Sequence, residues 1–84
     1  MNKDEIIKTL QQKIAVEILN LPDKKITNSE ALISSGLIDS FSLVDLAMLV
    51  EDVFNVRIED TELNADVFDT LDQLSEIIQA RINK

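Results

Sequence analysis

The stretch SGLIDSFSLVDL, residues 35–46, decides how this chain is organised, because it ends a long loop and begins a helix. Gly36, the single glycine of the chain, can adopt the positive φ that a sharp approach to a helix requires. The Asp39 carboxylate can cap the helix by accepting hydrogen bonds from the free N–H groups of the first turn. The sequence therefore predicts a helix from about Ser40 to Phe54, with Ser40 at its mouth.

Apolar residues at steps of three and four predict a further helix on either side of this stretch. The first runs from Asn2 to about Asn20, because Pro22 disfavours helical geometry just before it. The last begins at Thr70, which forms with Gln73 the pattern of a capping box. The expected buried stripes are Ile7, Leu10, Ile14, Ile18 and Leu21 in the first helix and Leu71, Leu74, Ile77, Ile78 and Ile82 in the last.

The segments between these helices are predicted to be a packed loop, a short extended segment and one brief helix. The loop over residues 22–39 is expected to bury Ile26, Leu32, Ile33 and Leu37. After it and the central helix, Val56 and Ile58 alternate as in an extended segment, and residues 64–68 favour a helical turn. We therefore expect one all-α domain over residues 1–84, a four-helix bundle with three longer helices and a short third helix.

Composition and charge exclude several classes of function. The chain of 84 residues has no cysteine and no histidine, which excludes disulfides and thiolate chemistry. Its first 38 residues hold five acids and five lysines, so the whole net charge of −8 lies in residues 39–84. An acidic half repels nucleic acid and anionic lipid, and no apolar run is long enough for a signal peptide or a membrane span. We expect a cytoplasmic monomer.

The helix predicted over residues 40–54 has two unlike faces when its residues are placed at intervals of about 100°. The face expected to be core collects Ala47, Phe54, Leu43, Val50, Leu46, Val53 and Leu49, with Ser42 as its one polar residue. The other face collects Ser40, Glu51, Val44, Met48, Phe41, Asp52 and Asp45. An apolar stripe rimmed by acids is typical of a surface that docks a basic partner. Taken singly, the serine could share the capping, the apolar residues could cover the loop, and the acids could be solvated.

Ser40 has no partners for nucleophilic catalysis. A serine nucleophile needs a neighbouring base, the chain has no histidine, and no serine–lysine motif or G-x-S-x-G sequence is present. The acids of residues 59–66 could suggest calcium, but they lack the spacing and the central glycine of an EF-hand. A serine that cannot act as the nucleophile of an enzyme can instead be a site of modification.

The same stretch, GLIDSFSLVDL, resembles the phosphopantetheine attachment signature of acyl carrier proteins. That signature is commonly Gly-x-x-Asp-Ser-hydrophobic, followed by Val-Glu-Leu at the same distance. The matching residues here are Gly36, Asp39, Ser40, Phe41, Val44, Asp45 and Leu46. Helix order, length and acidity agree with the family over nearly the whole chain. Ile38 and Phe41 differ from the small residue and the leucine usual in housekeeping fatty-acid carriers, and the motif is similar to stand-alone carriers of specialised pathways.

The resemblance implies an acyl-carrier-like fold and a carrier, not an enzyme. Ser40 would bear a 4′-phosphopantetheine arm transferred from coenzyme A by a phosphopantetheinyl transferase, with Asp39 as its motif neighbour. The arm would hold acyl or aminoacyl groups as thioesters for biosynthetic enzymes, in a fatty-acid, polyketide or D-alanyl pathway. Basic patches on these enzymes would dock on a partner-binding set of Phe41, Val44, Asp45, Met48, Glu51 and Asp52. The alternative is a cofactor-free, acidic helical adaptor.

Overall fold

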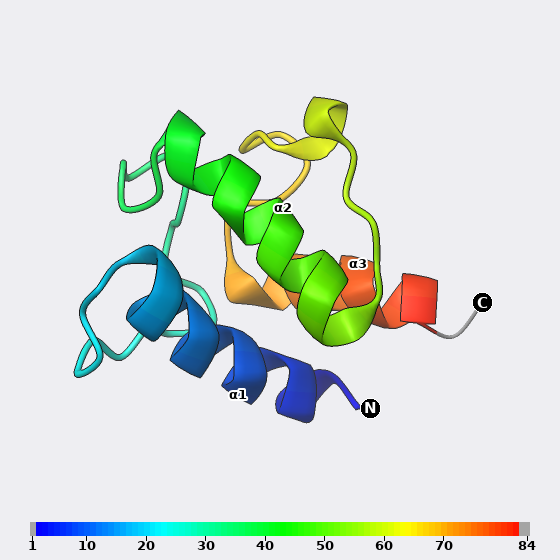
Figure 1. Cartoon of the computed structure of the whole chain (residues 1–84), viewed down its shortest axis with the longest axis horizontal. Helices are drawn as coiled ribbons and strands as arrows, with labels where there is room; N and C mark the ends of the chain where they lie inside the picture. The colour runs from blue at the N-terminus through cyan, green and yellow to red at the C-terminus, as the bar shows by residue number, and fades with distance from the viewer. Residues whose placement is uncertain (1, 83–84) are drawn as a thin grey trace.

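The computed structural model describes residues 2–82, and its regular structure is entirely helical. In chain order the elements are α1 (Lys3–Lys13), which continues into a π-helical segment (Ile14–Ile18), α2 (Ser40–Phe54), a 3₁₀ helix (Asp60–Glu62) and α3 (Leu71–Ile82). In Figure 1, α2 runs diagonally across the molecule, with α1 below it and α3 behind it. The predicted all-α class is confirmed, since residues 2–82 contain no strand.

The first helix begins as predicted and ends slightly early. Asn2 caps α1 in a reciprocal capping box with Glu5. The helical segment that follows ends at Ile18, because Asn20 takes a left-handed conformation with φ 55°. The N–H of Leu21 then bonds back to the carbonyl of Ala15 at 2.8 Å, which satisfies one of the carbonyls at the end of the helical segment. The expectation that Leu21 belongs to the buried stripe is wrong, since its side chain is 52% exposed.

The predicted count of four helices is not confirmed. Residues 65–67 form a turn instead of a short helix. The side chain of Asn64 accepts hydrogen bonds from the N–H groups of Asp66 and Val67, at 3.0 and 3.2 Å, and so competes with helical bonding there. The only regular element between α2 and α3, within the described residues, is the 3₁₀ helix Asp60–Glu62.

One hydrophobic cluster joins the three helices and the loops between them. Its buried members are Ile6, Ile7, Leu10, Ile14, Ile26, Leu32, Ile38, Leu43, Leu46, Val50, Phe54, Val56, Ile58, Phe68, Leu71, Leu74 and Ile78. Phe54 is buried as predicted, with 8% of its surface exposed. The core assignment of Val53 is wrong, since it is 38% exposed. Val53 lies one turn beyond buried Leu49, so the elements that bury this side of α2 end before the helix does.

The loops are packed as the sequence predicts. Ile26 and Leu32 are buried in the long loop before α2, and Ile33 and Leu37 pack against the same cluster. The loop therefore leads from the end of α1 to the start of α2 along the core, which gives Ser40 a defined position.

No helix within residues 2–82 has both the length and the apolar character needed to cross a bilayer.

Candidate functional site

The junction of loop and helix presents Ser40 as the first residue of α2, with its side chain exposed. Asp39 is extended, with φ −82° and ψ 176°, and its carboxylate accepts the N–H of Ser42 at 2.7 Å. That hydrogen bond, with lesser ones from the Ser42 hydroxyl and the Phe41 N–H, lowers the pKa of Asp39. Asp39 therefore caps α2 as an anion, as the sequence predicts.

The loop residues before Asp39 set the direction from which the chain enters α2. Gly36 has φ 81°, in the left-handed region that favours glycine, and a Cβ there would meet no atom within 4 Å. Glycine is thus required by backbone conformation and not by lack of space. Two residues later, buried Ile38 donates its N–H to the carbonyl of Leu32 at 2.9 Å. The chain is therefore fixed to the core just before Asp39 and Ser40.

A group of hydrogen bonds that the sequence analysis missed, here called the Asp69 clasp, ties this loop to the start of α3. The Asp69 carboxylate accepts the N–H of Ile33 at 2.7 Å, the N–H of Ser34 at 2.9 Å and the Ser34 hydroxyl. Its backbone carbonyl accepts the N–H of Leu32 at 2.7 Å. These bonds, with that from the Ser34 hydroxyl as the largest cause, hold the pKa of Asp69 below its ordinary value.

The outer face of α2, defined as Phe41, Val44, Asp45, Met48, Glu51 and Asp52, is exposed along its whole length. Phe41 is 85% exposed, Met48 59% and Val44 52%. The alternative that these three residues cover the long loop is therefore wrong. The structure places all of the predicted site residues, including Asp39 and Ser40, on one exposed surface that begins at the serine.

The charges of the outer face are free to act on another molecule. Within residues 2–82, Asp45, Glu51 and Asp52 form no ion pair. An apolar centre with an unpaired acidic rim is the composition of a docking surface for a basic protein.

Two of the four acids that could have suggested calcium, Glu59 and Glu62, are engaged in ion pairs. Glu59 pairs with Arg57 at 3.0 Å, and Glu62 pairs with Arg81 across to α3. The described residues contain no cluster of three or more acids that could hold a metal ion. The hydrogen bond from Arg81 is the largest cause of a lowered pKa of Glu62. We therefore assign Glu62 to the junction between the 3₁₀ helix and α3.

The Ser40 hydroxyl forms no hydrogen bond with another residue of the described range, so capping of α2 falls to Asp39 alone. With no histidine or cysteine in the chain, nothing of those types can activate it from within. The arrangement is an accessible primary alcohol beside a docking surface. Such an alcohol can receive a group from an enzyme that binds the outer face.

Comparison with known proteins identifies similar chains. Residues 9–78 match the protein family described as phosphopantetheine attachment site. The chain is 39% identical over 51 residues to an acyl carrier protein of Buchnera aphidicola subsp. Baizongia pistaciae, a match over 61% of this chain and 65% of that protein. It is 30% identical over 83 residues to an acyl carrier protein of Petrotoga mobilis, covering 99% of this chain and 94% of that one. No solved structure matches the chain significantly.

Proposed function

This chain belongs to the acyl carrier protein family, and from that premise we propose that Ser40 bears its phosphopantetheine group in a single carrier domain over residues 1–84. The protein is a carrier and not an enzyme, and its cofactor is covalently attached 4′-phosphopantetheine. The observation that carries the assignment to Ser40 is the position of its hydroxyl, exposed at the first residue of α2 beside the Asp39 cap.

The surroundings of Ser40 fit a phosphodiester. The positive end of the α2 dipole favours a negative group placed in the first helical turn, and the hydroxyl has no hydrogen bond within residues 2–82 to give up when it is modified. The arm supplies a thiol, which this cysteine-free chain lacks, and holds acyl groups as thioesters. Exposure of Ser40 lets the arm reach sites on other proteins, and tethering raises the concentration of its cargo there.

The outer face of α2 is the proposed docking surface for the enzymes that use the carrier. Carrier proteins of this family work with a phosphopantetheinyl transferase and with biosynthetic enzymes. Basic patches on these enzymes would meet Asp45, Glu51 and Asp52, while Val44 and Met48 would supply the buried centre of the interface. Phe41 follows Ser40 directly and is 85% exposed, so it would be accessible to an enzyme that reaches the arm.

The proposed cargo is an acyl or aminoacyl group of a specialised pathway. Ile38 and Phe41 flank the Asp-Ser pair; Ile38 is buried and Phe41 is exposed. Of the two positions that differ from housekeeping carriers, the one that can touch cargo or enzyme is therefore Phe41. We propose that the protein works as a monomer in the cytoplasm, without binding nucleic acid and without inserting into a membrane. The mass of the thioester-bound group on protein from its native cells would identify the cargo.

The test of the attachment site is modification by a phosphopantetheinyl transferase with coenzyme A, followed by intact mass. The parent should gain one arm, and Ser40→Ala should gain none. Ser42→Ala, which removes the next hydroxyl of the same helix, is the matched control and should still gain one arm. Ser40→Ala should lower the free energy of unfolding by at most about 0.5 kcal/mol, because Asp39 and not Ser40 caps the helix. A mass gain in Ser40→Ala would disprove the assignment.

A further inference from the structure

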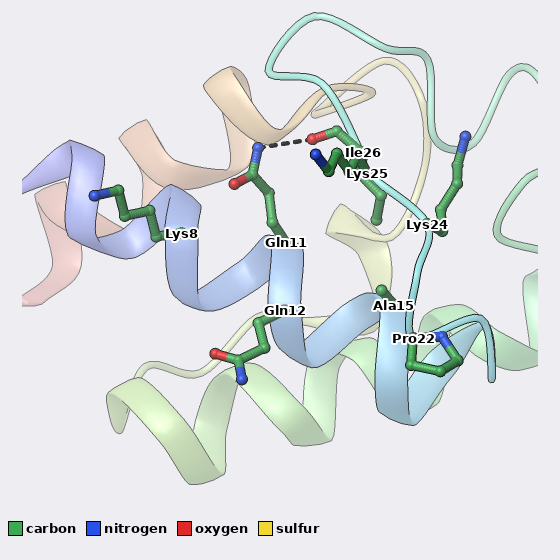
Figure 2. A pocket seen from close by; sticks show the side chains of 8 residues that line it. All are labelled: Lys8, Gln11, Gln12, Ala15, Pro22, Lys24, Lys25 and Ile26. Carbon is green, nitrogen blue, oxygen red and sulfur yellow. Dashed lines mark hydrogen bonds between the residues drawn. The ribbon is translucent and has the colours of Figure 1, made fainter.

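A pocket lies between α1 with its π-helical segment and the first part of the long loop (Figure 2). Its volume is about 390 Å³, within the range of small-ligand sites and near the lower end of it. Its lining combines apolar and positively charged side chains. They are Lys8, Gln11, Gln12, Ala15, Pro22, Lys24, Lys25 and Ile26.

The pocket holds the uncommitted positive charge of the described residues. Every other lysine and arginine of residues 2–82 forms an ion pair, including Lys24, which binds Glu30 at 3.0 Å. Lys8 and Lys25 form none, and their ammonium groups donate no hydrogen bond to another described residue. Both line this pocket. In a protein of net charge −8, two lysines at one cavity that pair with no acid of the described range create a local positive field.

The remainder of the pocket wall combines three apolar residues with the side-chain amides of Gln11 and Gln12. Ala15 and Ile26 are buried and Pro22 is exposed beside them. The Gln11 amide donates a hydrogen bond to the carbonyl of Ile26 at 2.7 Å, which ties the loop to α1 (Figure 2). Ala15 belongs to the π-helical segment, and such segments are frequent at functional sites.

We propose that this pocket binds a small amphipathic anion, a molecule that joins a carboxylate or phosphate group to a short apolar chain. The anionic group pairs with Lys8 and Lys25, and the apolar part packs against exposed Pro22, above the buried side chains of Ala15 and Ile26. Figure 2 shows Lys25 turned toward Gln11 and Lys8 extended along α1, so Lys8 must change rotamer to close on a ligand. Exposed side chains do so within nanoseconds. The proposal is independent of the function assigned to Ser40.

A neighbouring pocket of about 240 Å³ is a weaker candidate for the same ligand. It shares Lys8 and Gln11 but also contains Asp4, whose carboxylate repels an anion. No acid lines the larger pocket. The charges therefore favour the larger pocket and explain why an anion is the class of ligand it selects.

The experiment titrates the arm-bearing, ¹⁵N-labelled protein with octanoate, octyl phosphate, inorganic phosphate and octanol, and follows the amide resonances. Saturable shifts should appear at Ala15, Lys25 and Ile26 with octanoate, octyl phosphate or both, and the comparison of the two identifies the head group. Each of Lys8→Ala and Lys25→Ala should weaken binding a few-fold, and the double variant about tenfold, since each exposed ion pair contributes little. Lys13→Ala is the matched control, because Lys13 lies on α1 outside the pocket, and it should stay within about twofold.

The outcomes separate the proposal from non-specific binding. If neither amphiphile binds, if octanol binds as tightly as octanoate, or if Lys13→Ala weakens binding as much as the pocket variants, the proposal is overturned. It is equally overturned if the shifts cluster at Val44 and Met48 of the outer face. Inorganic phosphate should bind more weakly than octyl phosphate. Equal affinity would show that the apolar wall contributes nothing to binding. Circular dichroism checks that the variants are folded.

Discussion

The helices α1 and α2 begin alike and differ in what they expose. Each is capped by a side-chain oxygen, Asn2 accepting the N–H of Glu5 at 2.9 Å and Asp39 accepting that of Ser42 at 2.7 Å. Each turns a stripe of buried aliphatic residues to the same core. Over Lys3–Lys13, however, every large apolar residue is buried, whereas α2 leaves Phe41, Val44 and Met48 in solvent. The inner stripes account for the fold, and the exposed stripe of α2 supports the docking surface proposed above.

The largest effect we expect separates the two phenylalanines of α2. Phe54→Ala should lower the free energy of unfolding by about 3–5 kcal/mol, because it opens a cavity in the core. Phe41→Ala should change it by no more than about 0.5 kcal/mol, because Phe41 is 85% exposed. Urea denaturation of both variants measures the difference. Equal losses would mean that Phe41 is structural and that the contrast between the helices is false.

An intermediate effect concerns the Asp69 clasp, which secures the loop before α2. Asp69→Asn should cost about 1–2 kcal/mol at neutral pH, because hydrogen bonds to a charged acceptor become bonds to a neutral one. The pKa of Asp69 is lowered in the folded protein, so its contribution is present above the ordinary aspartate pKa and is lost as pH falls through the folded value. The variant should therefore lose less stability than the parent between pH 5 and 2, the pH range of aspartate titration.

Asp66→Asn is the control for that comparison, since Asp66 is exposed and forms no ion pair within the described residues. Urea titrations at several pH values give the three stability curves. A parent and an Asp69→Asn variant with parallel acid dependence would show that the clasp contributes no charge-dependent stability.

The smallest effects concern the outer face of α2 and should appear in binding kinetics alone. Met48→Ala removes apolar area from the interface centre, so it should speed dissociation from the transferase several-fold. Glu51→Lys reverses a rim charge, so it should slow association and weaken its salt dependence. Stopped-flow binding at low and high salt measures both, with thermal melts to show that neither variant unfolds. Rates like those of the parent in both variants would mean that enzymes dock elsewhere.

Local signals in the sequence predicted α2 and the start of α3 correctly. Asp39 identified the first residue of α2, and Phe54 is its last helical residue as expected. The Thr70–Gln73 capping box is present, with the N–H of Gln73 bonded to the Thr70 hydroxyl at 3.1 Å. A cap depends on residues three positions apart, so a sequence pattern contains all of its information.

Features that depend on distant residues could not be predicted in this way. The Asp69 clasp joins Asp69 to Ser34 and Ile33, which precede it by 35 and 36 positions. No local pattern distinguishes Asp69 from the other acids. The helical periodicity placed Val53 in the core, but its exposure depends on where the neighbouring elements end. The turn at residues 65–67 arises because the Asn64 side chain competes with the backbone for hydrogen bonds. The spacing of apolar residues does not predict this competition. The pocket between α1 and the loop likewise arises only when the loop folds back.

The Asp69 clasp also bears on when a newly made chain becomes ready for modification. Its hydrogen bond to Ile33 closes a loop of 36 residues that contains all of α2. Helices form in microseconds or less, while a contact across such a distance must first overcome the entropy of closing the loop. A nascent chain that has not yet been synthesised as far as residue 69 can form α2 but cannot pin the loop that leads into it. We therefore expect Ser40 to acquire its fixed presentation only after the ribosome has synthesised Asp69, which lies just before the last helix.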